Sequence, residues 1–458
     1  MGSSSDPRLT GLKAFLQGHP EIQYATPTSS NYEALRKTYI LDNPAVPLAI
    51  VRPQNAEDVA ALVTYAKANG LRIAVRSGGN SLFGKSMVND ALIVDMRDIA
   101  YVKLNESKTL ATVGGGIIMG DLANELTKQG LATAMGTIPF VGFVGWSTYG
   151  GYGPFSPQYG LGCDNIVGAK VVNFQAEVIE ADEEMLRGIR GAGGAFGPIV
   201  EMTVKVYQLK NILGGLIIFD STDILATARK VSAGYQALQA EGLPSPLYVQ
   251  QFALTAPFGK IFALAFFWGS DDHEQGQAWL TKVAALGDVI MNTVTPNTLA
   301  GFLEVMKTAV PPNAYGSIET MSIRGMTPEA IEIIARNIQR MPSTAGTSFS
   351  MHELRGSSAV PKADSIFASR EPHMMLEIIT TVADKTDLRE AQEWAQSFLS
   401  GLREMDPENI LPGTYISVTA PGSNSFENIF GVNYKPLLEM KRKWDPEGIY
   451  ALAPPEVE

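Results

Sequence analysis

The chain contains a single cysteine, Cys163, among its 458 residues. One cysteine cannot form an intrachain disulfide, so the sequence fits a reducing compartment. The four histidines lie far apart and show none of the spacings that metal ligands adopt, so no metal site is expected. The chain also lacks any run of basic residues, and its net charge is −11. Nucleic acid and anionic membrane surfaces are therefore not expected as partners.

Two targeting and catalytic signals are missing as well. The N-terminus has no apolar stretch of the kind that a secretory signal carries, so a cytoplasmic protein is expected. The Gly-x-Ser-x-Gly pattern of a hydrolase is absent, because Gly145–Tyr149 reads Gly-Trp-Ser-Thr-Tyr and misses the last glycine. With 45% hydrophobic and 18% charged residues, the chain is instead typical of a globular protein with a large core. Its length allows two or three domains, or one intertwined pair.

A strand–helix–strand unit leads into the most informative segment of the sequence. The apolar run Leu48–Val51 predicts the first strand, and Asn55 suits the N-cap of a helix that Gly70 would end. A second strand, Arg72–Val75, runs directly into Arg76–Ser81, which reads Arg-Ser-Gly-Gly-Asn-Ser. Glycines in such a turn leave backbone N–H groups unobstructed, which suits a phosphate group.

The Arg76–Ser81 segment resembles the pyrophosphate loop of the flavin-linked oxidases of the vanillyl-alcohol oxidase superfamily. The chain is similar above all to the berberine-bridge-enzyme-like oxidases of that superfamily, in particular the fungal enzymes of secondary metabolism. Five further segments resemble family motifs and follow one another in the family's order. They are Gly136–Pro139, Gly150–Pro154, Tyr159–Asn165, Arg190–Gly197, and Asn433–Tyr434 together with Lys443–Gly448.

The resemblance implies an α+β protein with the two-domain vanillyl-alcohol-oxidase-like fold. Residues 1–208 and 421–458 would form a discontinuous, PCMH-type FAD-binding domain, and residues 209–420 would form the substrate-binding domain. Apolar strands alternate with amphipathic helices after residue 209, which predicts one antiparallel sheet with helices on one face. The expected strands are Leu213–Phe219, Tyr248–Leu254, Ile261–Phe267 and Met374–Thr380, and the expected helices are Ile224–Glu241, Glu274–Leu286, Pro328–Arg340 and Lys385–Leu402.

The glycines of Gly191–Gly197 invite comparison with a Rossmann phosphate loop. Such a loop needs a strand before it and a helix after it. Here a helix-like segment, Asp182–Gly188, precedes the glycines, and a strand-like segment, Pro198–Val206, follows them. We therefore interpret Gly191–Gly197 as a helix-to-strand turn.

The resemblance also implies which residues bind FAD, and it implies a non-covalent cofactor. In relatives a histidine and a cysteine hold the flavin covalently, whereas this chain has Asn80 and Ile138 at those positions. Cys163 aligns with a position that contacts the adenine half, and we interpret it as a small buried thiol. The residues expected at the cofactor are Arg76, Ser77, Gly78, Gly79, Asn80, Ser81, Gly136, Thr137, Gly142, Gly145, Trp146, Gly151, Tyr152, Gly153, Gly160, Leu161, Asn165, Val167 and Asn433.

The segment after Pro139 departs further from the family text. Two glycines have become Phe140 and Val144, and a histidine has become Trp146. Because glycines let a backbone approach a cofactor closely, the bulkier residues must either point away or reshape the pocket. Drift at tolerant positions and remodelling of the flavin face for another task both remain open at this point.

The catalytic residues are less clearly marked. Relatives draw a base from the middle-domain strands or from a strand before the C-terminal segment, so Tyr415, His352, His373 and Glu377 are the candidates. Strand alternation would put Ser350 and His352 on one face of their strand, and Tyr248 and Gln250 on one face of another strand. Tyr415 is favoured, because the family text around it is the most regular, and an activated tyrosine can act as base or proton donor.

The favoured function is an FAD-dependent oxidoreductase acting on a small, largely apolar natural-product intermediate. It would pass a hydride to the flavin N5 and electrons to oxygen, while the protein supplies orientation and electrostatics. The alternative is a redox-neutral cyclase, a pericyclase such as a Diels-Alderase, on the same FAD-binding scaffold. Its motive is the loss of both covalent anchors together with the altered flavin-facing segment. A non-catalytic binding protein is a third class, and the oligomeric state is left open.

Overall fold

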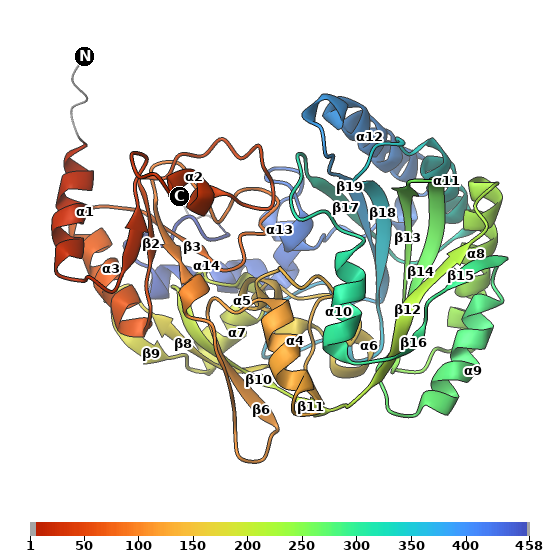
Figure 1. The fold of residues 1–458 in the computed structure, drawn as a ribbon, viewed down its shortest axis with the longest axis horizontal. Helices are drawn as coiled ribbons and strands as arrows, with labels where there is room; N and C mark the ends of the chain where they lie inside the picture. The colour runs from red at the N-terminus through yellow and green to blue at the C-terminus, as the bar shows by residue number, and fades with distance from the viewer. Residues whose placement is uncertain (1–5, 456–458) are drawn as a thin grey trace.

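The computed structural model describes residues 6–455, so the outermost residues of the expected FAD-binding domain, 1–5 and 456–458, lie outside the described part. The chain forms two lobes that lie side by side (Figure 1). The first lobe is built from β1–β11, α1–α7 and the C-terminal α13 and α14. The second lobe is built from β12–β19 and α8–α12. Between residues 6 and 455, no helix has both the length and the apolar character needed to cross a membrane.

The first lobe begins with a four-stranded sheet in the order β1-β2-β4-β3, in which β2 and β3 both run parallel to β4. The helix between β2 and β3 is the predicted one: Asn55 caps it by accepting from the Asp58 N–H, and Gly70, at φ +60°, follows its end. The bounds are α1 Pro7–Gln17, β1 Gln23–Ala25, α2 Tyr32–Arg36, β2 Ala49–Arg52, α3 Ala56–Ala68, β3 Ile73–Arg76 and β4 Leu92–Asp95.

A second, five-stranded antiparallel sheet completes the first lobe, in the order β5-β6-β10-β8-β9. The predicted helix-to-strand turn is confirmed, because α7 ends at Ala192 and β10 begins at Ile199, with positive φ at Gly191, Gly193 and Gly197. The bounds are β5 Val102–Leu104, β6 Leu110–Gly114, α4 Met119–Thr127, β7 Leu131–Ala132, α5 Phe143–Thr148, α6 Ser156–Tyr159, β8 Ile166–Val172, β9 Val178–Glu180, α7 Glu183–Ala192, β10 Ile199–Lys205, β11 Tyr207–Gln208, α13 Phe426–Phe430 and α14 Tyr434–Trp444.

The second lobe is one antiparallel sheet whose main path is β15-β12-β14-β13-β18-β19-β17, with β16 also paired to β12. Helices α8, α9, α11 and α12 cover its outer face (Figure 1), while α10 packs on the other side and joins the hydrophobic core of the first lobe. The bounds are β12 Ile212–Phe219, α8 Ile224–Glu241, β13 Leu247–Ala256, β14 Gly259–Trp268, α9 His273–Ala284, β15 Val289–Asn292, β16 Thr295–Asn297, α10 Leu299–Lys307, β17 Ile318–Ile323, α11 Pro328–Arg340, β18 Thr347–Leu354, β19 His373–Thr380 and α12 Leu388–Met405.

Side-chain alternation gives this sheet two different faces. On β14, Phe262, Leu264 and Phe266 belong to the core beneath the helices, whereas Ala263 and Ala265 belong to the core shared with the first lobe. Both faces are therefore covered, one by the helices of its own lobe and one by the neighbouring lobe. The face toward the first lobe is the one that carries the candidate site.

A buried ion pair joins the two lobes. Arg370, in the segment before β19, donates to both carboxylate oxygens of Asp164 at 2.6 and 2.8 Å. The two side chains are only 5% and 4% exposed. Removing one partner of such a pair leaves a charge without compensation in a dry environment, which is costly.

We expect Arg370→Met to lower the free energy of unfolding by about 3–5 kcal/mol, because it leaves the buried Asp164 carboxylate without its cationic partner. Urea unfolding followed by tryptophan fluorescence measures the change. Adding Asp164→Asn to Arg370→Met should restore part of the loss, since it removes the uncompensated charge. The control is Lys230→Met, which breaks an exposed ion pair to Asp288. A loss in Arg370→Met no larger than that of the control would contradict this role.

Candidate cofactor and substrate site

A cavity of about 510 Å³ lies between the two lobes. Its size falls within the range of small-molecule and cofactor sites. The first lobe supplies the loop after β3, the segments 136–152 and 194–199, and residues 450–454 near the C-terminus. The second lobe supplies the inner faces of β13, β18 and β19. The cavity is thus walled by parts of the chain that are distant in sequence.

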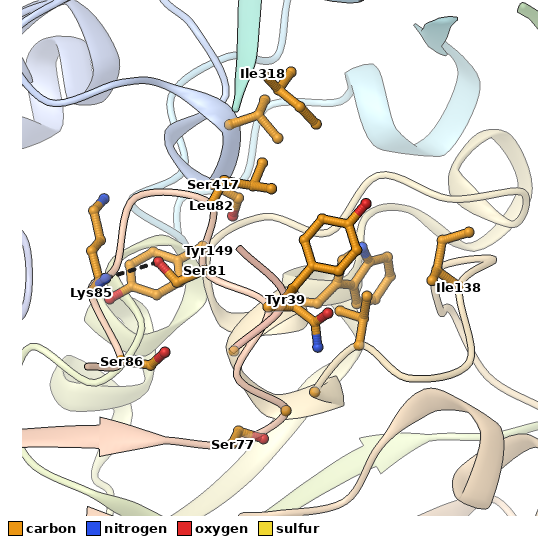
Figure 2. A pocket seen from close by; sticks show the side chains of 18 of the residues that line it. Tyr39, Ser77, Ser81, Leu82, Lys85, Ser86, Ile138, Tyr149, Ile318 and Ser417 are labelled. Atoms are coloured by element: carbon orange, nitrogen blue, oxygen red, sulfur yellow. Dashed lines mark hydrogen bonds between the residues drawn. The ribbon is translucent and has the colours of Figure 1, made fainter. Parts of the chain in front are cut away.

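The loop after β3 presents its backbone to the cavity. Gly78 and Gly142 lie backbone against backbone, since a Cβ placed on Gly142 would be 2.5 Å from the Gly78 nitrogen. Gly79 adopts φ +77°, a conformation that favours glycine. The Ser77 hydroxyl is buried and has no hydrogen-bond partner among residues 6–455, and Ser81 accepts from the Lys85 N–H at 3.1 Å (Figure 2). A loop whose backbone lines the cavity next to such a hydroxyl fits the pyrophosphate of FAD.

Arg76 supports this loop from behind the cavity wall. Its buried guanidinium donates to the backbone oxygens of Leu35 and Lys37, at 2.7 Å for Lys37. It also lies under Gly79, where an added Cβ would come within 2.8 Å of it. Burial lowers the pKa of Arg76 to about 10. The structure therefore brings Arg76 to the loop as a support rather than to the cavity surface.

Asn80 and Ile138 occupy the two positions that the resemblance assigns to covalent attachment. The Asn80 amide donates to the backbone oxygen of Phe140 at 2.7 Å. This hydrogen bond joins the loop after β3 to the loop before α5. Ile138 lines the cavity with an aliphatic side chain (Figure 2). Neither side chain carries a nucleophile.

The bulky residues Phe140, Val144 and Trp146 all line the cavity, so they shape it. The indole of Trp146 packs on glycines: a Cβ would come within 2.5 Å of its ring from Gly162 and within 3.0 Å from Gly151. Phe140 stacks with Tyr39 at 6.0 Å between ring centroids. The N-terminal segment thus adds an aromatic wall that the sequence motifs did not indicate (Figure 2).

A cluster of polar side chains faces the cavity from the second lobe. His352 on β18 is its centre: Nδ1 lies 2.6 Å from the Tyr248 hydroxyl, and Nε2 lies 3.3 Å from a Glu377 oxygen and 3.2 Å from the Gln250 amide nitrogen. Ser350 donates to the same Glu377 oxygen at 2.6 Å. The expected pairing of Ser350 with His352 on one face, and of Tyr248 with Gln250, is confirmed.

The cluster keeps Glu377 in its charged form. Burial alone would raise the pKa of this carboxyl, but the neighbouring His352 and the Ser350 hydroxyl together hold it below its ordinary value. A carboxylate is therefore available at neutral pH on the cavity wall. The His352 imidazole lies 3.3 Å from it, so the two side chains give the cluster the composition of an acid–base site.

Tyr415 also lines the cavity, but its local structure differs from the expected strand. It precedes a short 3₁₀ helix, Ile416–Val418, and its hydroxyl accepts from the Gly151 N–H at 3.3 Å. A strand was wrong here because neither Tyr415 nor its neighbours have a partner strand within residues 6–455. Burial raises the pKa of Tyr415 to about 12, so its phenol stays protonated at neutral pH.

His373 lies behind the cavity wall. Its Nδ1 is 2.6 Å from the Glu371 backbone oxygen and therefore carries the hydrogen, which leaves Nε2 to accept from the Tyr152 hydroxyl at 2.9 Å. Burial lowers the pKa of His373. Tyr152 in turn packs against Tyr415 at 4.8 Å between ring centroids. His373 is thus placed to orient Tyr152 and, through it, Tyr415.

Apart from Arg76, the predicted cofactor residues divide into those that line the cavity and those that lie in the framework around it. Several sit in the surrounding framework instead of on the wall; Asn165, for example, donates to the backbone oxygens of Tyr159 and Leu161, and Asn433 donates to that of Ile366. The lining group is Ser77, Gly78, Gly79, Asn80, Ser81, Gly136, Thr137, Gly142, Gly145, Trp146 and Tyr152, and the framework group is Gly151, Gly153, Gly160, Leu161, Asn165, Val167 and Asn433.

Other lining residues were missed by the sequence analysis. Lys85 and Ser86 follow the glycine loop closely, so their position in the sequence was an available signal. Tyr39 and Tyr450 come from distant segments and carried no local signal. Within the described range 6–455, no group of three or more His, Cys, Asp and Glu side chains could hold a metal ion.

Comparison with known proteins identifies the ligand of the first lobe. A family model described as FAD binding domain matches residues 47–182. FAD-linked oxidoreductase aurO of Gibberella zeae is 30% identical over 438 residues, which cover 94% of this chain and 85% of that protein. (R)-6-hydroxynicotine oxidase of Paenarthrobacter nicotinovorans is 37% identical over 196 residues, covering 42% of this chain and 43% of that protein.

Solved structures share the fold along nearly the whole chain. Wild-type BBE-like 1 of Physcomitrella patens superposes with a TM-score of 0.82 at 20% identity, covering 96% of this chain and 97% of that one. A chitooligosaccharide oxidase superposes with a TM-score of 0.82 at 21% identity, covering 96% and 98%. At these identities the likeness establishes the two-domain fold of the vanillyl-alcohol-oxidase type.

We expect Gly79→Ala to lower the affinity for FAD at least about 10-fold, because strained backbone of this kind costs roughly 1–3 kcal/mol and the Arg76 guanidinium blocks the new Cβ. The flavin content of the purified protein and titration with FAD measure the effect. The control is Gly325→Ala, where no described atom beyond the two neighbouring residues lies within 4 Å of the added Cβ. Equal FAD affinities in the two variants would refute the placement of the pyrophosphate on this loop.

Proposed function

The chain belongs to the family of FAD-linked oxidoreductases, which includes the berberine bridge enzyme-like proteins, and we propose that it oxidises a small, largely apolar organic substrate. The observation that carries the proposal is the position of the Glu377 carboxyl group, which faces the cavity 3.3 Å from the His352 Nε2. An oxidation that removes a hydride needs a group that takes up the accompanying proton, and this pair has the chemistry for it.

The rest of the second-lobe wall supports an apolar substrate. The side chains around the polar cluster are hydrophobic and come from β13, α10, β17 and β19. They include Phe252, Leu254, Met306, Ile318, Met375 and Ile379. A substrate with an apolar body and one hydrogen-bonding hydroxyl or amine would place that group against Glu377 and His352 and its body against this wall. A natural-product intermediate has this character.

Bound FAD would supply the redox step, taking up a hydride and passing two electrons to oxygen. The protein's own residues would handle the proton and the geometry. Glu377 would accept the proton, with Ser350 and His352 stabilising the carboxylate before the step. Tyr415 would stay neutral and orient the substrate as a hydrogen-bond donor, since burial raises its pKa. This assigns the base to Glu377 in preference to Tyr415, which the sequence alone favoured.

The division of labour between the lobes is part of the proposal. Residues 1–208 and 421–458 would bind FAD, and residues 209–420 would bind the substrate. The glycine loops that line the cavity on one side and the polar cluster on the other support it. A cytoplasmic location stays a prediction from the sequence, and the single cysteine fits it.

The flavin is expected to be bound without a covalent link, because Asn80 and Ile138 have no nucleophile to offer. Precipitating the protein with acid should leave the yellow colour in the supernatant. The measurement is flavin absorbance in both fractions, with a mass spectrum of the denatured chain as control. Colour retained in the pellet, together with a mass increase equal to FAD, would overturn this attachment mode.

Mixing the protein anaerobically with candidate substrates tests oxidation directly. If the proposal holds, flavin absorbance bleaches in step with substrate loss and returns when oxygen is admitted. Turnover without bleaching would contradict oxidation and support a redox-neutral cyclase, the alternative motivated by the bulky Phe140, Val144 and Trp146 on the wall.

Two matched variants locate the base within the same experiment. Glu377→Gln should slow bleaching about 10²-fold or more, as expected for loss of a general base. Tyr415→Phe should cost a smaller factor, because only a hydrogen bond is lost. The reverse order of effects would assign the base to Tyr415.

A further inference from the structure

A second cavity adjoins the first on the second-lobe side. Its volume is about 550 Å³, against about 510 Å³ for the first. The two cavities have a common boundary, because six residues line both of them. These residues are Leu254, Ala309, Val310, Pro311, Gly346 and Ser348. We call the second cavity the outer chamber.

One face of the second-lobe sheet runs through both cavities. On β13, Gln250, Phe252 and Leu254 line the first cavity, and Leu254 and Ala256 line the outer chamber. These residues alternate along the strand and therefore point to the same side of the sheet. A molecule that lies along this face can reach from the polar cluster into the outer chamber.

The strand register gives the distance from the polar cluster to the outer chamber. Ser350 of β18 pairs with Glu377 of β19, so these two residues mark the cluster. Ser348, two residues earlier, pairs with Leu254 at the common boundary. Because a strand rises about 3.4 Å per residue, Ser348 and Gly346 lie roughly 7 and 14 Å from Ser350. A ligand held at Glu377 must therefore be roughly 14 Å long to pass Gly346.

The loop after α10 forms another wall of the common boundary through residues 309–311. Both lobes hold this loop in place. The Ala314 N–H donates to the backbone oxygen of Tyr39 at 3.0 Å, and Tyr315 and Val382 exchange two backbone hydrogen bonds at 3.0 and 2.9 Å. The passage between the cavities therefore has walls that are fixed before any ligand binds.

The outer chamber is mainly apolar. The hydroxyls of Thr255 and Thr308 on its wall donate to backbone oxygens at 3.4 and 2.7 Å, so they are already used within the protein. The ammonium of Lys307, also on the wall, pairs with Glu304 at 3.2 Å. The chamber thus offers an apolar chain shelter from water. Its apolar residues include Leu254, Ala256, Pro257, Val310, Pro312 and Ala345.

We propose that the outer chamber binds an apolar tail of the substrate, while the reacting hydroxyl or amine lies at Glu377 and His352. The inference rests on the proposed function, because it takes the group that is oxidised as the polar head of the substrate. Bound FAD would occupy the first-lobe side of the first cavity, so the body of the substrate is left with the face of the sheet. The substrate class is then an elongated molecule with one polar end and a hydrocarbon body of roughly 14 Å or more.

Val310 is the specificity-determining residue in this arrangement. It lines both cavities, so a tail that enters the outer chamber passes it. Each methylene that the tail buries beyond this point contributes roughly fourfold in affinity. A carboxylate at this position would have to lose its hydration when the tail binds, which opposes binding.

Two para-alkylbenzamides with the same polar head test the tail. Para-methylbenzamide is too short to pass Gly346, whereas para-octylbenzamide is long enough, and neither has a carbon that bears a hydroxyl or amine to be oxidised. Isothermal titration calorimetry of the FAD-loaded protein gives both dissociation constants. The ratio of Kd for the methyl compound over Kd for the octyl compound reports what the tail contributes.

The variants are Ala256→Asp and Val310→Asp, which place a carboxylate on two different walls of the outer chamber. The matched control is Val432→Asp, the same change at an exposed residue that lines neither cavity. We expect a parent ratio of at least about 10², because the octyl compound has seven additional methylenes to bury. The ratio should fall at least about 10-fold in both variants and keep the parent value in the control.

Thermal unfolding verifies that each variant folds, and because the two substitutions lie on different elements, either one suffices for the test. A parent ratio near one, or an unchanged ratio in the folded variants, would overturn the proposal. An unchanged ratio together with a shifted elution volume in size-exclusion chromatography would instead assign the chamber to contact between two copies of the chain. The ratio does not depend on oxidation, so a large, variant-sensitive ratio in a protein whose flavin never bleaches would contradict the proposed oxidation alone.

Discussion

The close approach of two backbone loops is the constraint on which the cavity depends. Gly78 and Gly142 can lie against each other because neither carries a Cβ. The Asn80 amide then joins the same loops through Phe140, and Arg76 supports the first loop from below. A side chain on either glycine would separate the loops, and the amides that face the cavity would lose their common orientation.

The sheet of the second lobe has two faces that pack against different parts of the molecule. Along β13, alternate residues pack under the helices of the outer face, while Gln250 and Phe252 line the cavity and Tyr248 bonds to His352. The cost of burying the polar cluster on this face is offset because its members bond to one another, with His352 at the centre. The buried pair of Arg370 and Asp164 keeps this face in register with the first lobe.

Local signals account for what the sequence predicted well. Helices α8 and α11 have the expected bounds, Ile224–Glu241 and Pro328–Arg340, because caps and apolar spacing lie within each segment. The glycine loop was also predicted from a local signal, the consecutive glycines of Arg76–Ser81. Long-range contacts account for the rest: Tyr39, which was missed, reaches the cavity by stacking on Phe140, and His373, which was expected to be catalytic, lies behind the wall and bonds Tyr152. Neither arrangement leaves a mark in the neighbouring sequence.

The cavity wall draws on segments from residue 39 to residue 454, so it exists only when both lobes are folded and docked. A cofactor held there without a covalent bond would bind the native chain and not the unfolded one. Its free concentration would then add to the stability of the protein by mass action, about 1.4 kcal/mol for each tenfold excess over the dissociation constant. The supply of flavin in the cell would thereby set how much of this protein survives proteolysis, independently of any demand for its chemistry.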